Sequence, residues 1–324
     1  MTFPARRSSV RRWAGATALV VAGSLALAGC SDDDPVPTSG EAGGEPTATQ
    51  EPSPSESPSE SPSETPAETP AETPAESPSE TPAEGTAVPI YFAGDAPRGT
   101  ALFREFQRVS GDPLLEAARI VAGSGEATDP DYRTLWPQVE ISAVTPTDGV
   151  LLVEIPSDGF TERPDGMSKR LARLALQQLV YTLQGVQQER LPVVIDRPDT
   201  EARLFGMATG RPLRAASPMR TLNLVNITAP AEGDTVTRDV LTVSGVANSF
   251  EASGPCRLLQ GETELALVPY MLDGWAEDRL FPFQVDIPLD GVTGEVVVRC
   301  ETDDPSGGAE GNGPAIDTKT ITVQ

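Results

Sequence analysis

Residues 168–184 read SKRLARLALQQLVYTLQ, and this stretch decides the fold of the first half of the chain. Its apolar side chains recur every three or four residues, the spacing that places them on one face of a helix. The face predicted to meet a core carries Leu171, Leu174, Ala175, Leu179 and Leu183. The face predicted to meet water carries Arg170, Arg173 and Gln177. The stretch therefore predicts a long helix with a folded domain packed against one side.

Shorter elements are predicted on both sides of this helix. Strands are expected at 88–92, 102–109, 141–144, 149–155 and 191–195. Between the second and third strands, Asp112 suits an N-cap, Pro113 suits the first helical position and Gly123 suits the end of a short helix. Mixed elements with short connections favour helices layered on a sheet, and we predict an α+β domain over residues 87–218.

Several segments of this domain carry a family resemblance. They are residues 90–92, 103–109, 113–123, 150–156, Phe160 and, as the most specific of them, the run LQQLVYTL at 176–183. In this order they resemble the GerMN domain of sporulation and spore-germination proteins, over residues 87–215. The resemblance implies a module of germination or sporulation complexes, or of lipoproteins that modulate envelope signalling.

The second half of the chain has an all-β pattern. Strands are expected at 222–227, 240–245, 256–259, 283–287, 294–300 and 319–323. Turn residues separate them, which predicts a β-sandwich over residues 219–324. The segments 227–230, 243–247 and 281–283 resemble the immunoglobulin-like domain of bacterial spore-germination proteins, which accompanies GerMN domains in that family.

The N-terminus has the features of a lipoprotein signal peptide. A basic region with four arginines is followed by an apolar run, residues 14–27, which is too short to span a bilayer. The run ends in Leu27-Ala28-Gly29-Cys30, the small-residue pattern that precedes a lipid-modified cysteine. We predict that residues 1–29 are removed and that acylated Cys30 anchors the chain at the extracytoplasmic face of the cell membrane. The alternative is an ordinary cleaved signal peptide followed by a chance cysteine.

A low-complexity segment follows the predicted anchor. From Ser53 to Glu84 the sequence repeats Ser/Thr-Pro-Ser/Ala-Glu every four residues. Proline at every fourth position interrupts helices and sheets, and the segment has almost no apolar side chains to bury. We predict that residues 30–86 are a disordered linker. It would serve either as a stalk that lifts the folded domains from the membrane or as a spacer of indifferent length.

Two further cysteines lie on predicted strands of the sandwich. If Cys30 carries lipid, Cys256 and Cys300 are the remaining thiols in an oxidising compartment. We predict a structural disulfide between them, and the alternative is a pair of buried free thiols. No Cys-x-x-Cys spacing suggests redox chemistry.

Composition excludes most kinds of catalysis. Without histidine the chain has no Ser-His-Asp or Cys-His site, and it contains no phosphate loop or dinucleotide-binding motif. Paired carboxylates could hydrolyse glycosides, but in a chain with 48 acidic residues most acids are surface groups. The acids near 303–310 match no calcium-loop spacing. We therefore expect no enzyme, cofactor or metal, and the net charge of −24 argues against nucleic-acid binding.

Aromatic residues give the one hint of a binding face. Tyr270, Trp275 and Phe281 cluster between two predicted strands, and the alternative is that they pack inside the sandwich. Together these features predict a non-catalytic envelope lipoprotein that binds or scaffolds an envelope protein or a wall polymer. Two alternatives remain, a modulator of an envelope sensor kinase and a carboxylate-based wall hydrolase.

Overall fold

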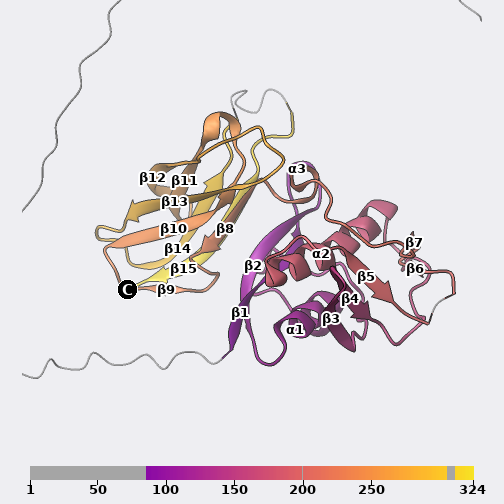
Figure 1. The fold of residues 1–324 in the computed structure, drawn as a ribbon. Helices are drawn as coiled ribbons and strands as arrows, with labels where there is room; N and C mark the ends of the chain where they lie inside the picture. The colour runs from indigo at the N-terminus through magenta and orange to yellow at the C-terminus, as the bar shows by residue number, and fades with distance from the viewer. Residues whose placement is uncertain (1–84, 199, 305–310) are drawn as a thin grey trace, which may run out of the picture. The chain divides into compact units, whose positions relative to one another are not determined.

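The computed structural model describes residues 85–198, 200–304 and 311–324. All of them belong to one compact unit. The predicted signal peptide, Cys30 and all but the last two residues of the predicted linker lie outside the described residues. Within the described residues there are two large hydrophobic cores, one formed between Val88 and Phe205 and the other between Val225 and Val323. We call the parts around these cores the α+β lobe and the sandwich lobe (Figure 1).

The α+β lobe is built from two small sheets and two main helices. Strands β1 (Thr86–Gly94) and β2 (Ala101–Val109) pair antiparallel. In the second sheet, β4 (Val150–Glu154) lies between antiparallel β3 (Ala143–Thr147) and parallel β5 (Val193–Asp196). The helices are α1 (Pro113–Arg119), continued by one π-helical turn (Ile120–Ser124), and α2 (Lys169–Gln187). The hairpin β6 (Arg203–Leu204) and β7 (Met207–Ala208) and the short α3 (Pro218–Thr221) follow. The predicted α+β fold is confirmed.

The residues at both ends of the first helical segment behave as the sequence predicted. The side chain of Asp112 accepts hydrogen bonds from the amides of Leu114 and Leu115, and Pro113 is the first helical residue. Gly123 has a φ of +91°, a conformation that glycine adopts without strain. A side chain there would also press on the backbone of Gln138. The helix therefore ends where the sequence predicted.

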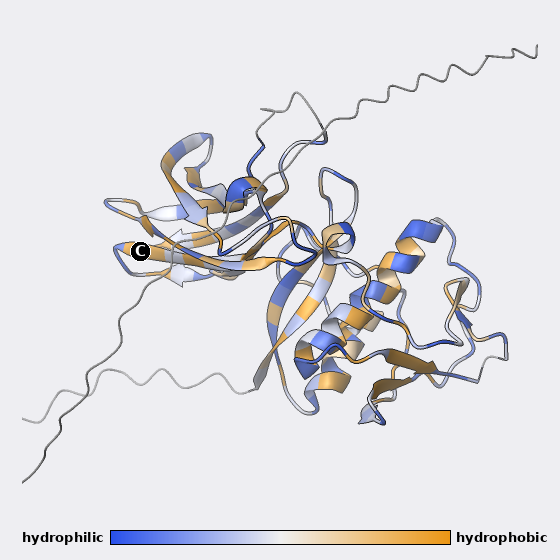
Figure 2. Ribbon diagram, turned by 45° about the horizontal axis from the view of Figure 1, so that its top comes forward, coloured by the Kyte–Doolittle hydropathy of each residue, from blue (hydrophilic) through white to orange (hydrophobic). Residues whose placement is uncertain are grey.

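Helix α2 is more deeply buried than its sequence pattern suggests (Figure 2). Ser168 caps it, and Leu174, Ala175, Leu179 and Leu183 are buried as expected. Two polar side chains are also fully buried, since Gln178 accepts from the amide of Leu135 and Thr182 accepts from the amide of Tyr91. Gln178 and Thr182 thus accept hydrogen bonds from backbone amides of two segments that pack on the helix. Neighbouring segments therefore cover α2 on more than one side.

The sandwich lobe consists of two facing sheets. One has the order β13-β10-β8 and the other β12-β11-β14-β15-β9. The strands are β8 (Val225–Ala229), β9 (Thr235–Val236), β10 (Val240–Ala247), β11 (Ser253–Gln260), β12 (Thr263–Met271), β13 (Phe281–Pro288), β14 (Gly294–Glu301) and β15 (Ile316–Val323). A 3₁₀ turn (Phe250–Ala252) precedes β11. Inward side chains alternate with outward ones, most regularly on β13. The predicted sandwich is confirmed, with β9 and β12 added to the six expected strands.

Candidate functional site

The predicted aromatic binding face does not form. Tyr270 lies on the inner face of β12, stacks on Phe283 and donates its hydroxyl proton to the carbonyl of Glu301. Phe281 begins β13 and is also buried. Trp275 alone is exposed, with its ring packed edge-on against Phe250. The prediction is therefore corrected for Tyr270 and Phe281, because alternation on their strands turns both rings into the core.

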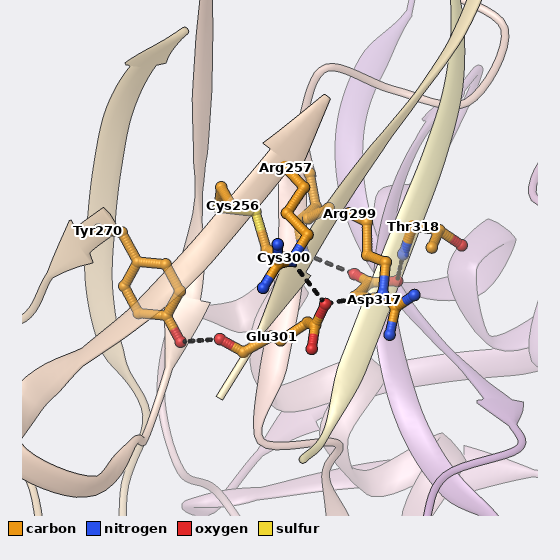
Figure 3. Close-up of a disulfide and its surroundings, with 9 residues drawn as sticks. Cys256, Arg257, Tyr270, Arg299, Cys300, Glu301, Asp317 and Thr318 are labelled. Atoms are coloured by element: carbon orange, nitrogen blue, oxygen red, sulfur yellow. Dashed lines mark hydrogen bonds and ion pairs between the residues drawn. A yellow bond between two sulfur atoms is a disulfide. The ribbon is translucent and has the colours of Figure 1, made fainter. Parts of the chain in front are cut away.

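The two sandwich cysteines form a disulfide (Figure 3). Cys256 on β11 and Cys300 on β14 are directly opposite each other in neighbouring strands, and both are fully buried. On the outer side of the same strands, Arg257 and Arg299 both form ion pairs with Glu301 (Figure 3). The bridge thus lies within one sheet, in surroundings that suit a structural role.

Four titratable side chains are buried where the two lobes meet. Asp129 and Tyr132 come from the α+β lobe, and Asp317 and Lys319 come from β15. The Nζ of Lys319 pairs with Asp129 and donates to the hydroxyl of Tyr132 at 2.8 Å, while that hydroxyl donates to Asp317. The amide of Ile227 donates to the other oxygen of Asp317 at 2.6 Å. We call these four side chains the junction cluster. Because residues of the two lobes pair with one another in it, the cluster joins the lobes.

Burial controls the protonation of the junction cluster. It raises the pKa of Asp317 to about 6, against the opposing effects of Lys319, Tyr132 and the amide of Ile227. Burial and the nearby carboxylate of Asp317 raise the pKa of Tyr132, which therefore stays protonated. At neutral pH the cluster holds two carboxylates against one ammonium, so ionised Asp317 costs stability.

This cost predicts a specific pH dependence. The folded protein holds the proton of Asp317 more tightly than the unfolded chain, whose ordinary pKa is 3.8. The free energy of unfolding should therefore fall as pH rises from about 4 to about 6, by up to about 3 kcal/mol from this group. In Asp317→Asn this fall should be absent, whereas in the control Asp131→Asn, which changes an exposed neighbour, it should persist. Urea denaturation across this pH range measures it, and equal slopes in wild type and Asp317→Asn would disprove the assignment.

A pocket of about 310 Å³ also opens where the lobes meet. Tyr91 and Arg104 are opposite each other on β1 and β2, and both line it. The rest of the lining comes from the end of α2 and the residues after it, from α3 and Leu222, from Val246 on β10 and from the segment before β13. It includes Tyr181, Arg190 and Arg279. Three guanidinium groups thus line one hollow of a strongly acidic chain.

Arg104 is fixed by contacts across the lobe junction. Its amide donates to the side chain of Asn226 at 3.1 Å, and its Nη2 donates to the hydroxyl of Thr228 at 2.8 Å. Its Nε is buried and has no hydrogen-bond partner among the described residues. The guanidinium also lies over the ring of Phe106. Arg104 therefore has no ion pair within the described part of the chain, although it is half-buried.

Within the described residues, no group of three or more metal-binding side chains comes together. No helix in this part of the chain is long and apolar enough to cross a membrane. We take the pocket around Tyr91 and Arg104 as the candidate functional site, because the buried Nε of Arg104 has no hydrogen-bond partner among the described residues. Sequence reasoning missed it because Arg190 and Arg279 are far from Arg104 along the chain, and the pairing of Tyr91 with Arg104 in a predicted hairpin was its one local signal.

The fold and the site define a class of protein: two lobes, one of them an immunoglobulin-like sandwich, with a basic pocket where the lobes meet. Residues 224–309 of this chain match the family described as the immunoglobulin-like domain of bacterial spore germination. The matched residues lie in the sandwich lobe, so this lobe is similar to that domain. A search of curated proteins found no match.

One solved structure similar to this chain has a related name. It is that of the tandem GerMN domains of the sporulation protein GerM from Bacillus subtilis, at 12% identity and a TM-score of 0.31. The similarity covers 63% of this chain, which spans 62% of the length of the GerM chain. The two descriptions, immunoglobulin-like domain of spore germination and GerMN domain, are those of the families that the sequence resembles.

Proposed function

We propose that this chain is a non-catalytic lipoprotein of the bacterial cell envelope that binds an envelope component in the pocket at its lobe junction. Acylated Cys30 would hold it at the extracytoplasmic face of the membrane. The lipobox pattern supports the anchor, and the name of the matched family supports a germination-type or sporulation-type module. Among the alternatives, a modulator of a sensor kinase is a narrower form of the same proposal, in which the bound component is the kinase.

The lining of the pocket carries this proposal. A glycoside hydrolase needs two carboxyl groups flanking the scissile bond. The pocket offers one carboxylate, Glu189, beside three arginines and two tyrosines. Asp129 and Asp317 in the junction cluster are buried, and Lys319 pairs with Asp129. The pocket therefore suits holding a ligand and lacks the groups that would cleave one.

Crosslinking in living cells tests the proposal. A photo-reactive amino acid would replace Gln188, an exposed residue at the pocket, in the full chain. The matched control replaces exposed Thr147, which does not line the pocket. We expect one envelope protein or wall fragment to be captured from position 188 and not from position 147, and Cys30→Ser should abolish capture by releasing the chain. Equal capture from both positions, or release of soluble sugars from purified wall by the wild type, would refute the proposal.

A further inference from the structure

We infer that the pocket at the lobe junction binds an isolated anionic group, a carboxylate or a phosphate, carried on an otherwise uncharged molecule. This inference rests on the proposed binding function and names its ligand class. The observations that carry it are the position of the arginines, the absence of an ion pair at Arg104 and Arg190 among the described residues, and the charge of the rest of the chain.

Arg104 and Arg190 both act electrostatically on the hydroxyl of Tyr91. Burial raises the pKa of Tyr91, and three weaker effects oppose that rise: the charge of Arg104, a side-chain hydrogen bond with Arg104, and the charge of Arg190. Among the described residues neither arginine has an ion pair, and Arg190 is exposed. A guanidinium has five donors in a planar fork that matches the two oxygens of a carboxylate or phosphate. An anionic group beside Tyr91 would therefore meet two cations that have no other counter-ion.

Arg104 has the stronger reason to bind an anion. Its Nη2 is used by Thr228, but the buried Nε lacks an acceptor. A buried donor without a partner is unfavourable, and a ligand oxygen that reached this Nε would satisfy it. The backbone amide and the Nη2 of Arg104 are already bonded to Asn226 and Thr228 of β8, so little side-chain entropy remains to be lost on binding.

Opposing charges in the pocket limit the number of anions to one. The end of α2 brings the partial negative charge of a helix C-terminus, and Glu189 is exposed at the rim. Arg279 already pairs with Glu277 at 2.8 Å. The chain as a whole has a net charge of −24. A polyanion would be repelled along most of its length, whereas a single anionic group on a neutral body would meet only the arginines.

Apolar walls fit the uncharged part of such a ligand. The pocket is also lined by Tyr181, Leu222, Val246 and Leu280. Ligand sites commonly combine an apolar lining with a few placed polar groups that fix orientation. The volume suits one end of a small molecule or of a polymer side chain. The recognised end would carry the charge, and the apolar walls would hold the atoms next to it.

Titration calorimetry on the full chain in neutral detergent tests the inference at low ionic strength. The carboxylate probe is N-acetyl-alanine, with its uncharged amide as control. The phosphate probe is glycerol 1-phosphate, with glycerol as control. We expect at least one anionic probe to bind and neither neutral control to bind, with affinity falling as salt is added. Which probe binds distinguishes a carboxylate ligand from a phosphate ligand.

Three variants complete the test. Arg104→Gln and Arg190→Gln should each weaken binding of the anionic probe about tenfold or more, the loss expected for one charge-assisted hydrogen bond. Arg190 is exposed, so we expect its variant to fold and to remain informative if Arg104→Gln is unstable. Arg133→Gln, an exposed arginine outside the pocket, should bind as the wild type does.

Two results would overturn the inference: no binding of either anion at any soluble concentration, or equal binding of N-acetyl-alanine and its amide. If position 188 still captures one component in cells while neither anion binds, the ligand class is wrong and the binding function stands. If both experiments fail, the binding function falls as well.

Discussion

Replacing Lys319 with methionine should lower the free energy of unfolding by about 3–5 kcal/mol at neutral pH. Lys319 is 3% exposed and is the cation of the junction cluster, where it pairs with Asp129 and lies 3.9 Å from Asp317. Methionine keeps most of the stem but leaves two buried carboxylates without a counter-ion. Removing one partner of a buried ion pair is costly because the other charge stays desolvated.

The loss in Lys319→Met should shrink as pH falls through about 6, because protonation of Asp317 removes one of the uncompensated charges. A change due only to packing would show no such recovery. Urea denaturation followed by circular dichroism at pH 7 and pH 5 measures both effects. The matched control is Arg133→Met, which breaks the ion pair between Arg133 and Asp95. Their side chains are 50% and 85% exposed, so this variant should change stability by less than about 1 kcal/mol. A loss in Lys319→Met no larger than in this control would show that the cluster does not hold the lobes together.

The junction cluster also bears on the proposed function. The pocket takes Tyr91 and Arg104 from one lobe and Val246 and Arg279 from the other, so it exists only while the lobes are in contact. Small hydrophobic contacts around Leu222 support the same junction. Losing Lys319 should therefore weaken ligand binding without touching the pocket itself. Stability and binding are coupled through the lobe contact.

Much of the fold could be predicted from the sequence, because helix caps, helix-ending glycines and strand alternation depend on residues that are close together in the chain. Asp112 caps α1, Gly123 ends it, and every expected strand of the sandwich is present. Strand β12 was missed for two reasons. Its leucines, alanine and glutamate are as common in helices as in strands, and it contains Pro269. As an edge strand it tolerates a proline that a central strand would not. Pro146 similarly lies in edge strand β3, where a turn was expected.

The site could not be predicted in the same way. Both the junction cluster and the pocket combine side chains that are more than 80 residues apart, and no local pattern reports such pairs. Lys319 lies between threonines on an alternating strand, and its burial becomes intelligible only when Asp129 is placed against it. The predicted aromatic face failed for a related reason, since the boundary of β12 determines whether Tyr270 points inward or outward.

Loss of the disulfide is the second change with a large expected effect. The double variant Cys256→Ala/Cys300→Ala should lower the free energy of unfolding of the sandwich lobe by about 4 kcal/mol on the chain-entropy model for a loop of this length. The cysteines are 44 residues apart and both are fully buried. Changing both together avoids leaving one buried free thiol. Denaturation of the oxidised wild type and of the variant measures the difference.

The wild type refolded under a reductant is the control that separates the cross-link from packing. It keeps both sulfur atoms at Cys256 and Cys300 but has no bond between them, so only the entropy of the unfolded chain changes. If the cross-link stabilises the lobe, the reduced wild type should be nearly as unstable as the double variant, and the variant itself should not respond to reductant. If reduction leaves the wild type unchanged, the loss in the variant comes from the missing sulfur volume. In that case the sandwich does not depend on an oxidising compartment, and the disulfide no longer supports the export predicted from residues 1–29.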